Sequence, residues 1–318
     1  MTEFGYWLSS EEHTPRDLIA DARRSEEAGF AFAMISDHFH PWIDAQGHSP
    51  FVWSVVGGIG ATTERIRLGT GVTCPMIRTH PAIVAHAAAT SAALMGDRFF
   101  LGLGTGENLN EHVTGARWPA PDERVEMLEE AIEVIRLLWE GGEQTHRGKH
   151  YTLDHARLYT LPERPPEIAV AAAKPNAAEL AGRLGDAFVN TSPDAEIVEA
   201  YHSAGGKGPT YGQVRLCWAE DEEQAKQTVF ELWRHSGLTG TVNQELPRPS
   251  DFDAAARSVT LEMATDKVPC GPDPEPVLEQ VREWERAGFD HIAFHQVGPD
   301  QDGFFRFWEK ELRPRLSG

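Results

Sequence analysis

The sequence predicts an α/β fold, a (β/α)8 TIM barrel with insertion segments, because short apolar segments alternate with amphipathic helical segments along its 318 residues. One pattern occurs near both ends, as RRSEEAGFAFAMISDHF and REWERAGFDHIAFHQVG: a Glu/Arg-rich helix ends at Ala-Gly-Phe and leads into an apolar run. Short apolar runs of this kind are typical of buried parallel strands. Strands that alternate with helices indicate a parallel sheet, and eight of them favour a closed barrel.

The elements follow from this pattern in chain order. The predicted strands cover residues 4–9, 32–37, 66–72, 99–106, 167–173, 186–192, 213–219 and 291–296. The predicted helices cover residues 15–28, 79–95, 123–140, 175–184, 194–204, 221–236 and 274–287. The segment at about 237–271 is less periodic and rich in Pro and polar residues, which predicts an insertion before the last strand. No linker divides the chain, so we expect a single domain over residues 1–318.

Composition and charge exclude several classes of protein. The formal net charge of -20 argues against nucleic acid and anionic membranes as partners, since both attract basic surfaces. Solubility explains this acidity, and adaptation to a salt-rich cytoplasm is the alternative. No apolar run reaches the about 18 residues that a membrane-spanning helix needs, and MTEFGYWLSS does not resemble a signal peptide. The 3 cysteines are odd in number and far apart, which fits a reducing, cytoplasmic location.

Polar residues gather where the apolar strands end. In (β/α)8 barrels the chemistry lies at the C-terminal ends of the strands. The residues that the sequence places there are Asp37, His38, Trp42, Thr73, Cys74, Thr105, Gly106, Glu107, Asn110, Lys174 and Thr191. This arrangement is typical of an active site.

The stretch SDHFHPW holds the first candidate catalytic residues. His38 can give or take a proton near neutral pH, and Trp42 can face a planar ring system. The alternative is a loop histidine that is capped by the neighbouring Asp37. His38 and His40 have the spacing of some metal ligands, but the chain offers neither HExxH nor a cysteine cluster to complete a site, so no metal is predicted.

Two glycine-containing strand ends provide the other candidates. In GLGTGENLNE (102–111), closely spaced glycines let a backbone approach a ligand, and Glu107 lies beside this turn. Glu107 is either a general acid or base or a solvated loop carboxylate. The pattern matches a dinucleotide-binding motif only loosely, since it follows the fourth strand rather than the first. In GTGVTCP (69–75) a strand ends in small residues and a proline, which indicates at least a tight turn.

Taken together, these motifs resemble a known family. SDHFHPW, GTGVTCPMIRTHPA, FFLGLGTGENLNE, RVEMLEEAIEVIRLLWEG and GFDHIAFH look like the luciferase-like superfamily, and within it the coenzyme F420-dependent oxidoreductases of sugar phosphates and secondary alcohols. The resemblance runs from about residue 3 to residue 316. It implies a bacterial luciferase-like barrel, hydride transfer on F420 and a homodimer.

The resemblance also implies a role for individual residues. His38 is the histidine beside the deazaflavin, Trp42 lines the substrate pocket, and Glu107 is the partner acid or base. Gly71-Val72 matches a non-proline cis peptide behind the ring system. The other positions that match contacts to the cofactor, including its phosphate at a helix N-terminus, are Asp37, Cys74, Thr105, Gly106, Asn110, Ala173, Lys174, Asn176 and Ala177. Oxidation of an alcohol needs two proton-handling groups, and His38 and Glu107 form the predicted pair in either assignment of base and acid.

The substrate motif departs from the sugar-phosphate enzymes. Thr191 matches a substrate-contacting threonine. The position where these enzymes have their first lysine is occupied by Asp194, and DFDAAARS offers no lysine where a second one is expected. Lys267 matches the position of an arginine. Loss of two cations and gain of an acid disfavour a phosphate dianion. We therefore expect a small alcohol, sugar or carbonyl substrate, although Lys207 and Lys267 leave a sugar 6-phosphate open.

Three functional hypotheses follow. The leading one is an F420-dependent dehydrogenase or reductase, with a sugar-6-phosphate dehydrogenase as a variant. The second is an FMN-dependent monooxygenase of the same superfamily. The third is a barrel that binds the cofactor without turnover. The presence of His38, Trp42 and Glu107 argues against the third, because a carrier needs no acid–base pair.

Overall fold

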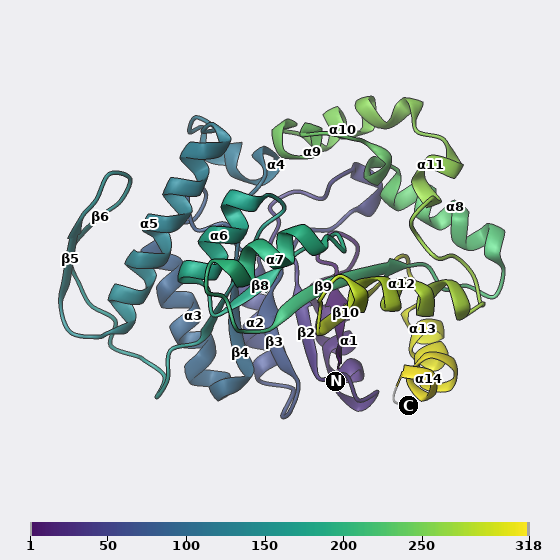
Figure 1. Cartoon of the computed structure of the whole chain (residues 1–318), viewed down its shortest axis with the longest axis horizontal. Coiled ribbons are helices and arrows are strands. Elements are labelled where there is room, and N and C mark those ends of the chain that lie inside the picture. Colours follow the sequence, from purple (N-terminus) through teal and green to yellow (C-terminus); the bar gives the residue numbers. More distant parts are fainter. Residues whose placement is uncertain (1, 317–318) are drawn as a thin grey trace.

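Eight parallel strands close into a barrel in the computed structural model, which describes residues 2–316 (Figure 1). Their order around the barrel is β1-β10-β9-β8-β7-β4-β3-β2. The barrel strands are β1 (Glu3–Leu8), β2 (Phe32–Ile35), β3 (Arg67–Thr70), β4 (Phe99–Leu103), β7 (Glu167–Ala171), β8 (Ala187–Val189), β9 (Thr210–Leu216) and β10 (His291–Gln296). The predicted fold class is therefore confirmed.

Helices surround the barrel and connect its strands. The longer helices are α1 (Pro15–Glu27), α2 (Val52–Gly60), α3 (Pro81–Met95), α5 (Pro121–Trp139), α6 (Pro175–Leu184), α7 (Ala195–Ser203), α8 (Glu222–Trp233) and α12 (Glu275–Arg286). Shorter ones are α4 (Asn108–Glu111), α9 (Val242–Glu245), α10 (Pro249–Ala255), α11 (Leu261–Thr265), α13 (Gln301–Phe307) and α14 (Arg313–Leu316). The single-turn and π segments are η1 (Asp44–Gln46), η2 (Gly96–Arg98), η3 (His112–Thr114), η4 (Arg234–Gly237), η5 (Ala256–Ser258) and η6 (Trp308–Leu312).

Each predicted strand and helix has a counterpart, with one clear shift. The strand predicted at 213–219 is β9, which begins at Thr210 and ends at Leu216. The apolar run continues beyond the end of the strand. There the backbone of Cys217 forms an isolated parallel β-bridge with the backbone of Cys270, and both thiols are free. Helix α5 begins two residues earlier than predicted, at Pro121, because proline suits the first turn of a helix.

Several elements escaped prediction. Helix α2 is Gly-rich and apolar nearly throughout, and it carries no polar face that would give a helical period. The antiparallel pair β5 (Gln144–Arg147) and β6 (Thr152–Ala156) forms a separate hairpin, which projects beside α5 in Figure 1. Within 237–271 lie α9, α10, η5 and α11, which are too short for periodicity to reveal.

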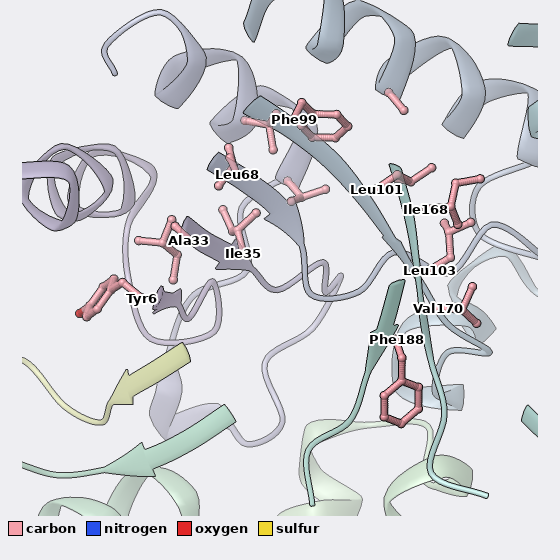
Figure 2. Packing of buried hydrophobic residues seen from close by; sticks show 14 of the residues in the cluster. Tyr6, Ala33, Ile35, Leu68, Phe99, Leu101, Leu103, Ile168, Val170 and Phe188 are labelled. Carbon is pink, nitrogen blue, oxygen red and sulfur yellow. The ribbon is translucent and has the colours of Figure 1, made fainter. Parts of the chain in front are cut away.

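Two apolar layers stabilise the barrel. The larger one lies between the strands and the surrounding helices, and Figure 2 shows part of it, including Tyr6, Leu68, Leu101 and Phe188. A smaller cluster fills the barrel interior, as expected from the alternation of side chains along each strand. Its buried members are Phe32, Met34, Phe100, Ala169, Ala187, Val189, Tyr211 and Ala293. The barrel is therefore packed inside and not a pore.

Candidate active site

The C-terminal end of the barrel forms a mouth above this packed interior. Phe100 and Tyr211 stack with ring centroids 5.0 Å apart and close the interior below. Trp7, Val72 and Ala171 pack on the same cluster, but they are only partly buried. The mouth is consequently accessible, and its floor is apolar.

His38 lies in this mouth, just after β2, and is held from two sides. Its Nδ1 lies 3.2 Å from the carbonyl oxygen of His40, which can only accept, so Nδ1 carries a proton. Its Nε2 lies 3.4 Å from Oε1 of Glu11. Glu11 is 2 % exposed, and its Oε2 accepts hydrogen bonds from Ser36 Oγ at 2.6 Å and Ser9 Oγ at 3.0 Å. A buried carboxylate thus faces Nε2, the ring nitrogen of His38 that does not contact His40.

Trp42 lies against His38, as the sequence predicted for a shared site. The two ring centroids are 5.0 Å apart. On its other side Trp42 stacks on His235 at 5.3 Å and meets the edge of Phe252, from the insertion segment, at 5.4 Å. Burial, and after it the charge of Arg215, lowers the pKa of His235 well below its usual value, so this ring is neutral near pH 7. Elements far apart in sequence therefore form one aromatic wall.

Asn110 connects the loop of Glu107 with the loop of His38. Its Nδ2 donates to Oε2 of Glu107 at 3.3 Å, and its Oδ1 accepts from the backbone N–H groups of Phe39 at 2.8 Å and His40 at 3.3 Å. The two predicted proton-handling residues are thus held on loops that share one buried asparagine.

Asp37 is occupied by other protein groups. Its Oδ2 accepts from Thr73 Oγ1 at 2.8 Å, and its Oδ1 accepts from Arg78 Nη2 at 2.8 Å. Arg78 also contacts buried Glu111, whose Oε2 accepts from the Arg78 backbone N–H at 2.7 Å. Burial raises the pKa of Glu111. Both carboxylate oxygens of Asp37 therefore have protein partners. These hydrogen bonds connect the loop after β2 with the loop after β3.

The end of β3 packs closely on the end of β4. The Gly71-Val72 peptide bond is cis, as the resemblance implied. A Cβ added at Gly104 would lie 2.7 Å from Cγ2 of Val72, and one at Gly106 would lie 2.7 Å from Sγ of Cys74. Gly106 also has φ of +68°, which favours glycine. Cys74 is buried beneath this turn, and this burial raises the pKa of its thiol.

The chain is similar to known proteins over most of its length. The model of the family described as luciferase-like monooxygenase matches residues 1–291. The chain belongs to this family. Its similarity to an F420-dependent glucose-6-phosphate dehydrogenase from Nocardia farcinica is 35% identity, over 99% of this chain and 98% of the relative. The enzyme of the same name from Mycolicibacterium gilvum is 34% identical, over 99% and 98% of the two chains.

A solved structure of the family is also very similar. It is an F420-dependent secondary alcohol dehydrogenase in complex with an F420-acetone adduct, and it has 27% sequence identity and a TM-score of 0.90. The match covers 98% of this chain and 98% of that chain. The coenzyme F420-dependent tetrahydromethanopterin reductase from Methanopyrus kandleri, at 20% identity and a TM-score of 0.76, shares the fold.

Within this luciferase-like barrel, the residues predicted to hold a phosphate lie at an exposed helix start. Lys174 precedes α6, and its side chain makes no capping hydrogen bond. Ala173, Lys174 and Asn176 are exposed, whereas Ala177 is buried. The Ala177 N–H is bonded to Asn176 Oδ1 at 2.9 Å. Thr105 is partly exposed at the end of β4, on the loop that carries Gly106 and Glu107.

The residues considered for binding a substrate phosphate do not lie together at one place in the mouth. Thr191 is exposed after β8, and Asp194 caps α7, where its Oδ1 accepts from Glu196 N–H at 3.0 Å. Lys267 is exposed, and its carbonyl accepts from Gln280 of α12 in the outer layer. Lys207 precedes β9 and therefore lies at the opposite end of the barrel from His38. Lys207 is thus wrong as a substrate-binding candidate.

Sequence reasoning missed the residues at the ends of β1, β9 and β10. These are Glu11, Glu12, Arg215 and His295, together with Trp233 of α8. The signal was present, since the rule that polar residues gather at strand ends applies equally to the SSEEH and FHQ motifs. Among residues 2–316, no group of three or more His, Cys, Asp or Glu is arranged to hold a metal ion. In the same range, no helix is long and apolar enough to cross a membrane.

Proposed function

We propose that this protein is an F420-dependent oxidoreductase that transfers hydride between a small alcohol, sugar or carbonyl substrate and the deazaflavin. The observation that carries the proposal is the position of His38 in the mouth of a luciferase-like barrel, where it contacts the carboxylate of Glu11 and the ring of Trp42. Relatives that are named F420-dependent dehydrogenases cover nearly the whole chain. The structural neighbour with a TM-score of 0.90 is named for the same cofactor.

The residues of the mouth fit a planar cofactor. The apolar floor, with the partly buried side chains Trp7, Val72 and Ala171, offers a surface on which a planar ring system can lie. The exposed start of α6, with Lys174 and Asn176, fits a phosphate, because a helix N-terminus favours negative charge. When bound, F420 supplies a carbon that accepts or donates hydride and does not activate oxygen.

The protein's own groups handle the protons. When an alcohol is oxidised, His38 accepts the hydroxyl proton at Nε2, and Glu11 at 3.4 Å stabilises the imidazolium that forms. Glu107, oriented by Asn110, would donate the proton that the deazaflavin needs when it takes up hydride. Trp42, His235 and Phe252 exclude water from one side of the pocket. In carbonyl reduction the roles are reversed: His38 donates a proton to the substrate oxygen, and Glu107 accepts one.

The substrate is proposed to lack a phosphate group. Asp194 is committed to the start of α7, and Lys207 lies at the far end of the barrel. The alternative, a sugar-6-phosphate dehydrogenase, is favoured by the names of relatives at 35% and 34% identity. An FMN-dependent monooxygenase of the same family is the other alternative.

The test is a tryptophan-fluorescence titration with F420, FMN and NADPH, followed by an absorbance assay of F420 reduction. We expect F420 to bind at least 100-fold more tightly than FMN, about 2.7 kcal/mol. We also expect turnover of secondary alcohols but not of glucose 6-phosphate. Equal binding of the three cofactors contradicts the proposal, and tight FMN binding with oxygen consumption supports the monooxygenase instead.

A further inference from the structure

A guanidinium lies on the side of the mouth that the proposed mechanism does not use. Arg215 of β9 pairs in register with His295 of β10. Side chains two residues apart on a strand share a face, and Tyr211 on the same strand belongs to the interior cluster. Arg215 therefore points into the barrel, at its C-terminal end, above Tyr211.

Arg215 has few protein partners. Its guanidinium carbon lies 4.0 Å from the ring centroid of Trp233, and its Nε lies 3.4 Å from Nδ1 of His295. In the described residues 2–316 its two terminal nitrogens have no hydrogen-bond partner, and no carboxylate forms an ion pair with it. By contrast, Arg78 and Arg234 each pair with a carboxylate.

The nearby carboxylates are engaged elsewhere. Glu12 accepts from Trp233 Nε1 at 2.8 Å and from Gly298 N–H at 2.8 Å, and its Oε1 lies 2.9 Å from Nε2 of His295. Donors from Gln213 and Arg215 both face Nδ1 of His295, so Nδ1 accepts and Nε2–H donates to Glu12. His295 is consequently a neutral spacer that holds Arg215 at a distance from Glu12.

The barrel topology places Arg215 opposite the proposed cofactor surface. In the closed order of strands, β9 and β3 are separated by β8, β7 and β4 on one side and by β10, β1 and β2 on the other. The Gly71-Val72 peptide follows β3, so Arg215 faces it across the mouth. A substrate that lies between the two occupies the same mouth as His38.

We propose that Arg215 binds a carboxylate of the substrate, so that the substrate class is a small hydroxy acid or the corresponding oxo acid. The two free nitrogens form a planar fork that matches a carboxylate. One guanidinium balances the single charge of a carboxylate, whereas the second charge of a phosphate dianion is left unbalanced and is repelled by Glu11 and Glu12 on the adjoining loop. This inference rests on the proposed function and narrows its substrate.

The experiment titrates the protein–F420 complex with lactate, 2-hydroxybutyrate, 2-propanol and glucose 6-phosphate and measures binding by isothermal titration calorimetry. The proteins are wild type, Arg215→Met, Arg215→Lys and the control Arg234→Met, which removes an arginine paired with Asp253. We expect Arg215→Met to weaken hydroxy-acid binding by about 100-fold, the worth of one or two charge-assisted hydrogen bonds. Arg215→Lys retains part of the affinity, whereas 2-propanol binding and the control variant do not change.

The outcomes separate this inference from the proposed function. If F420 binds but the wild type takes up no hydroxy acid, or Arg215→Met and Arg215→Lys leave that affinity within 3-fold, the carboxylate assignment is wrong. If glucose 6-phosphate alone loses affinity in Arg215→Met, Arg215 is a phosphate site instead. If F420 fails to bind, the proposed function fails, and the same titrations without cofactor still test Arg215.

Discussion

At the scale of single residues, two adjacent carboxylates have different partners. Glu11 faces His38 in the mouth, whereas Glu12 faces His295. Burial alone would raise the pKa of Glu12, but hydrogen bonds from His295 and Gly298 outweigh it and lower the pKa to about 2. Burial also lowers the pKa of His295. Glu12 is therefore a permanent anion that orients a neutral imidazole, whereas Glu11 is the carboxylate proposed to stabilise charge on His38.

The role of Glu11 leads to a kinetic prediction. Glu11→Gln keeps the shape of the side chain but cannot stabilise an imidazolium, so we expect kcat to fall about 100-fold while KM and F420 affinity change little. Steady-state kinetics and a fluorescence titration measure these quantities. Glu11→Asp should recover part of kcat, which a packing role alone would not predict.

A control variant sharpens this test. Glu3→Gln removes an exposed carboxylate at the opposite end of β1 and should leave kcat unchanged. If Glu11→Gln raises KM and leaves kcat intact, Glu11 contacts the substrate instead of positioning His38.

At the scale of elements, short helices of 237–271 complete the site. Phe252 of α10 reaches Trp42, and the carbonyl of Glu245 in α9 accepts from Asn108 Nδ2 at 2.9 Å, next to Glu107. Elements of four to seven residues are shorter than two helical turns, so their sequence carries no measurable period. Their contacts with the ends of β2 and β4 show how a segment without periodicity contributes a wall of the pocket.

Helix α1 provides a prediction about pH. Burial, and then the charge of Asp17, raises the pKa of Asp21 to about 7 from its usual 3.8. The unfolded chain loses this proton at lower pH than the folded protein, so wild-type stability from this group falls as pH rises from about 4 to about 7. Asp21→Asn removes the effect, and its Tm relative to wild type should be higher at pH 8 than at pH 4.

Thermal unfolding at several pH values measures this difference. A constant difference for Asp21→Asn across this range would show that the Asp21 pKa is not raised.

At the scale of the whole molecule, the net charge of -20 opposes compaction. The screening length falls from about 30 Å at 0.01 M salt to about 10 Å at 0.1 M, so salt should relieve this repulsion. We expect Tm to rise by about 3 °C or more between 10 mM and 300 mM KCl. The same concentrations of NaCl should give the same rise. Scanning calorimetry measures the shift.

The shape of the salt dependence separates two origins of the acidity. A plateau above about 0.3 M is expected if the charge serves solubility, whereas a continued rise above 1 M indicates adaptation to a salt-rich cytoplasm. A Tm that does not change below 0.3 M contradicts the repulsion argument itself.

The barrel and part of its mouth could be predicted from the amino-acid sequence alone. Alternation of apolar strands with amphipathic helices is a local property, so the strands and the polar groups after β2, β3 and β4 could be predicted. The glycine at 106 and the small residues of GTGVTCP are also local signals of turns, whereas the cis Gly71-Val72 bond was implied only by the family resemblance.

Which polar groups lie together could be seen only in the folded protein. The pairs Glu11–His38 and Glu12–His295 join residues that are far apart in the chain, and neighbouring carboxylates in one loop carry no signal that assigns their partners. Arg215 became a candidate because strand closure places β9 across from β3. Closure of the barrel is a long-range event, and the contacts it creates depend on three-dimensional packing that no local pattern encodes.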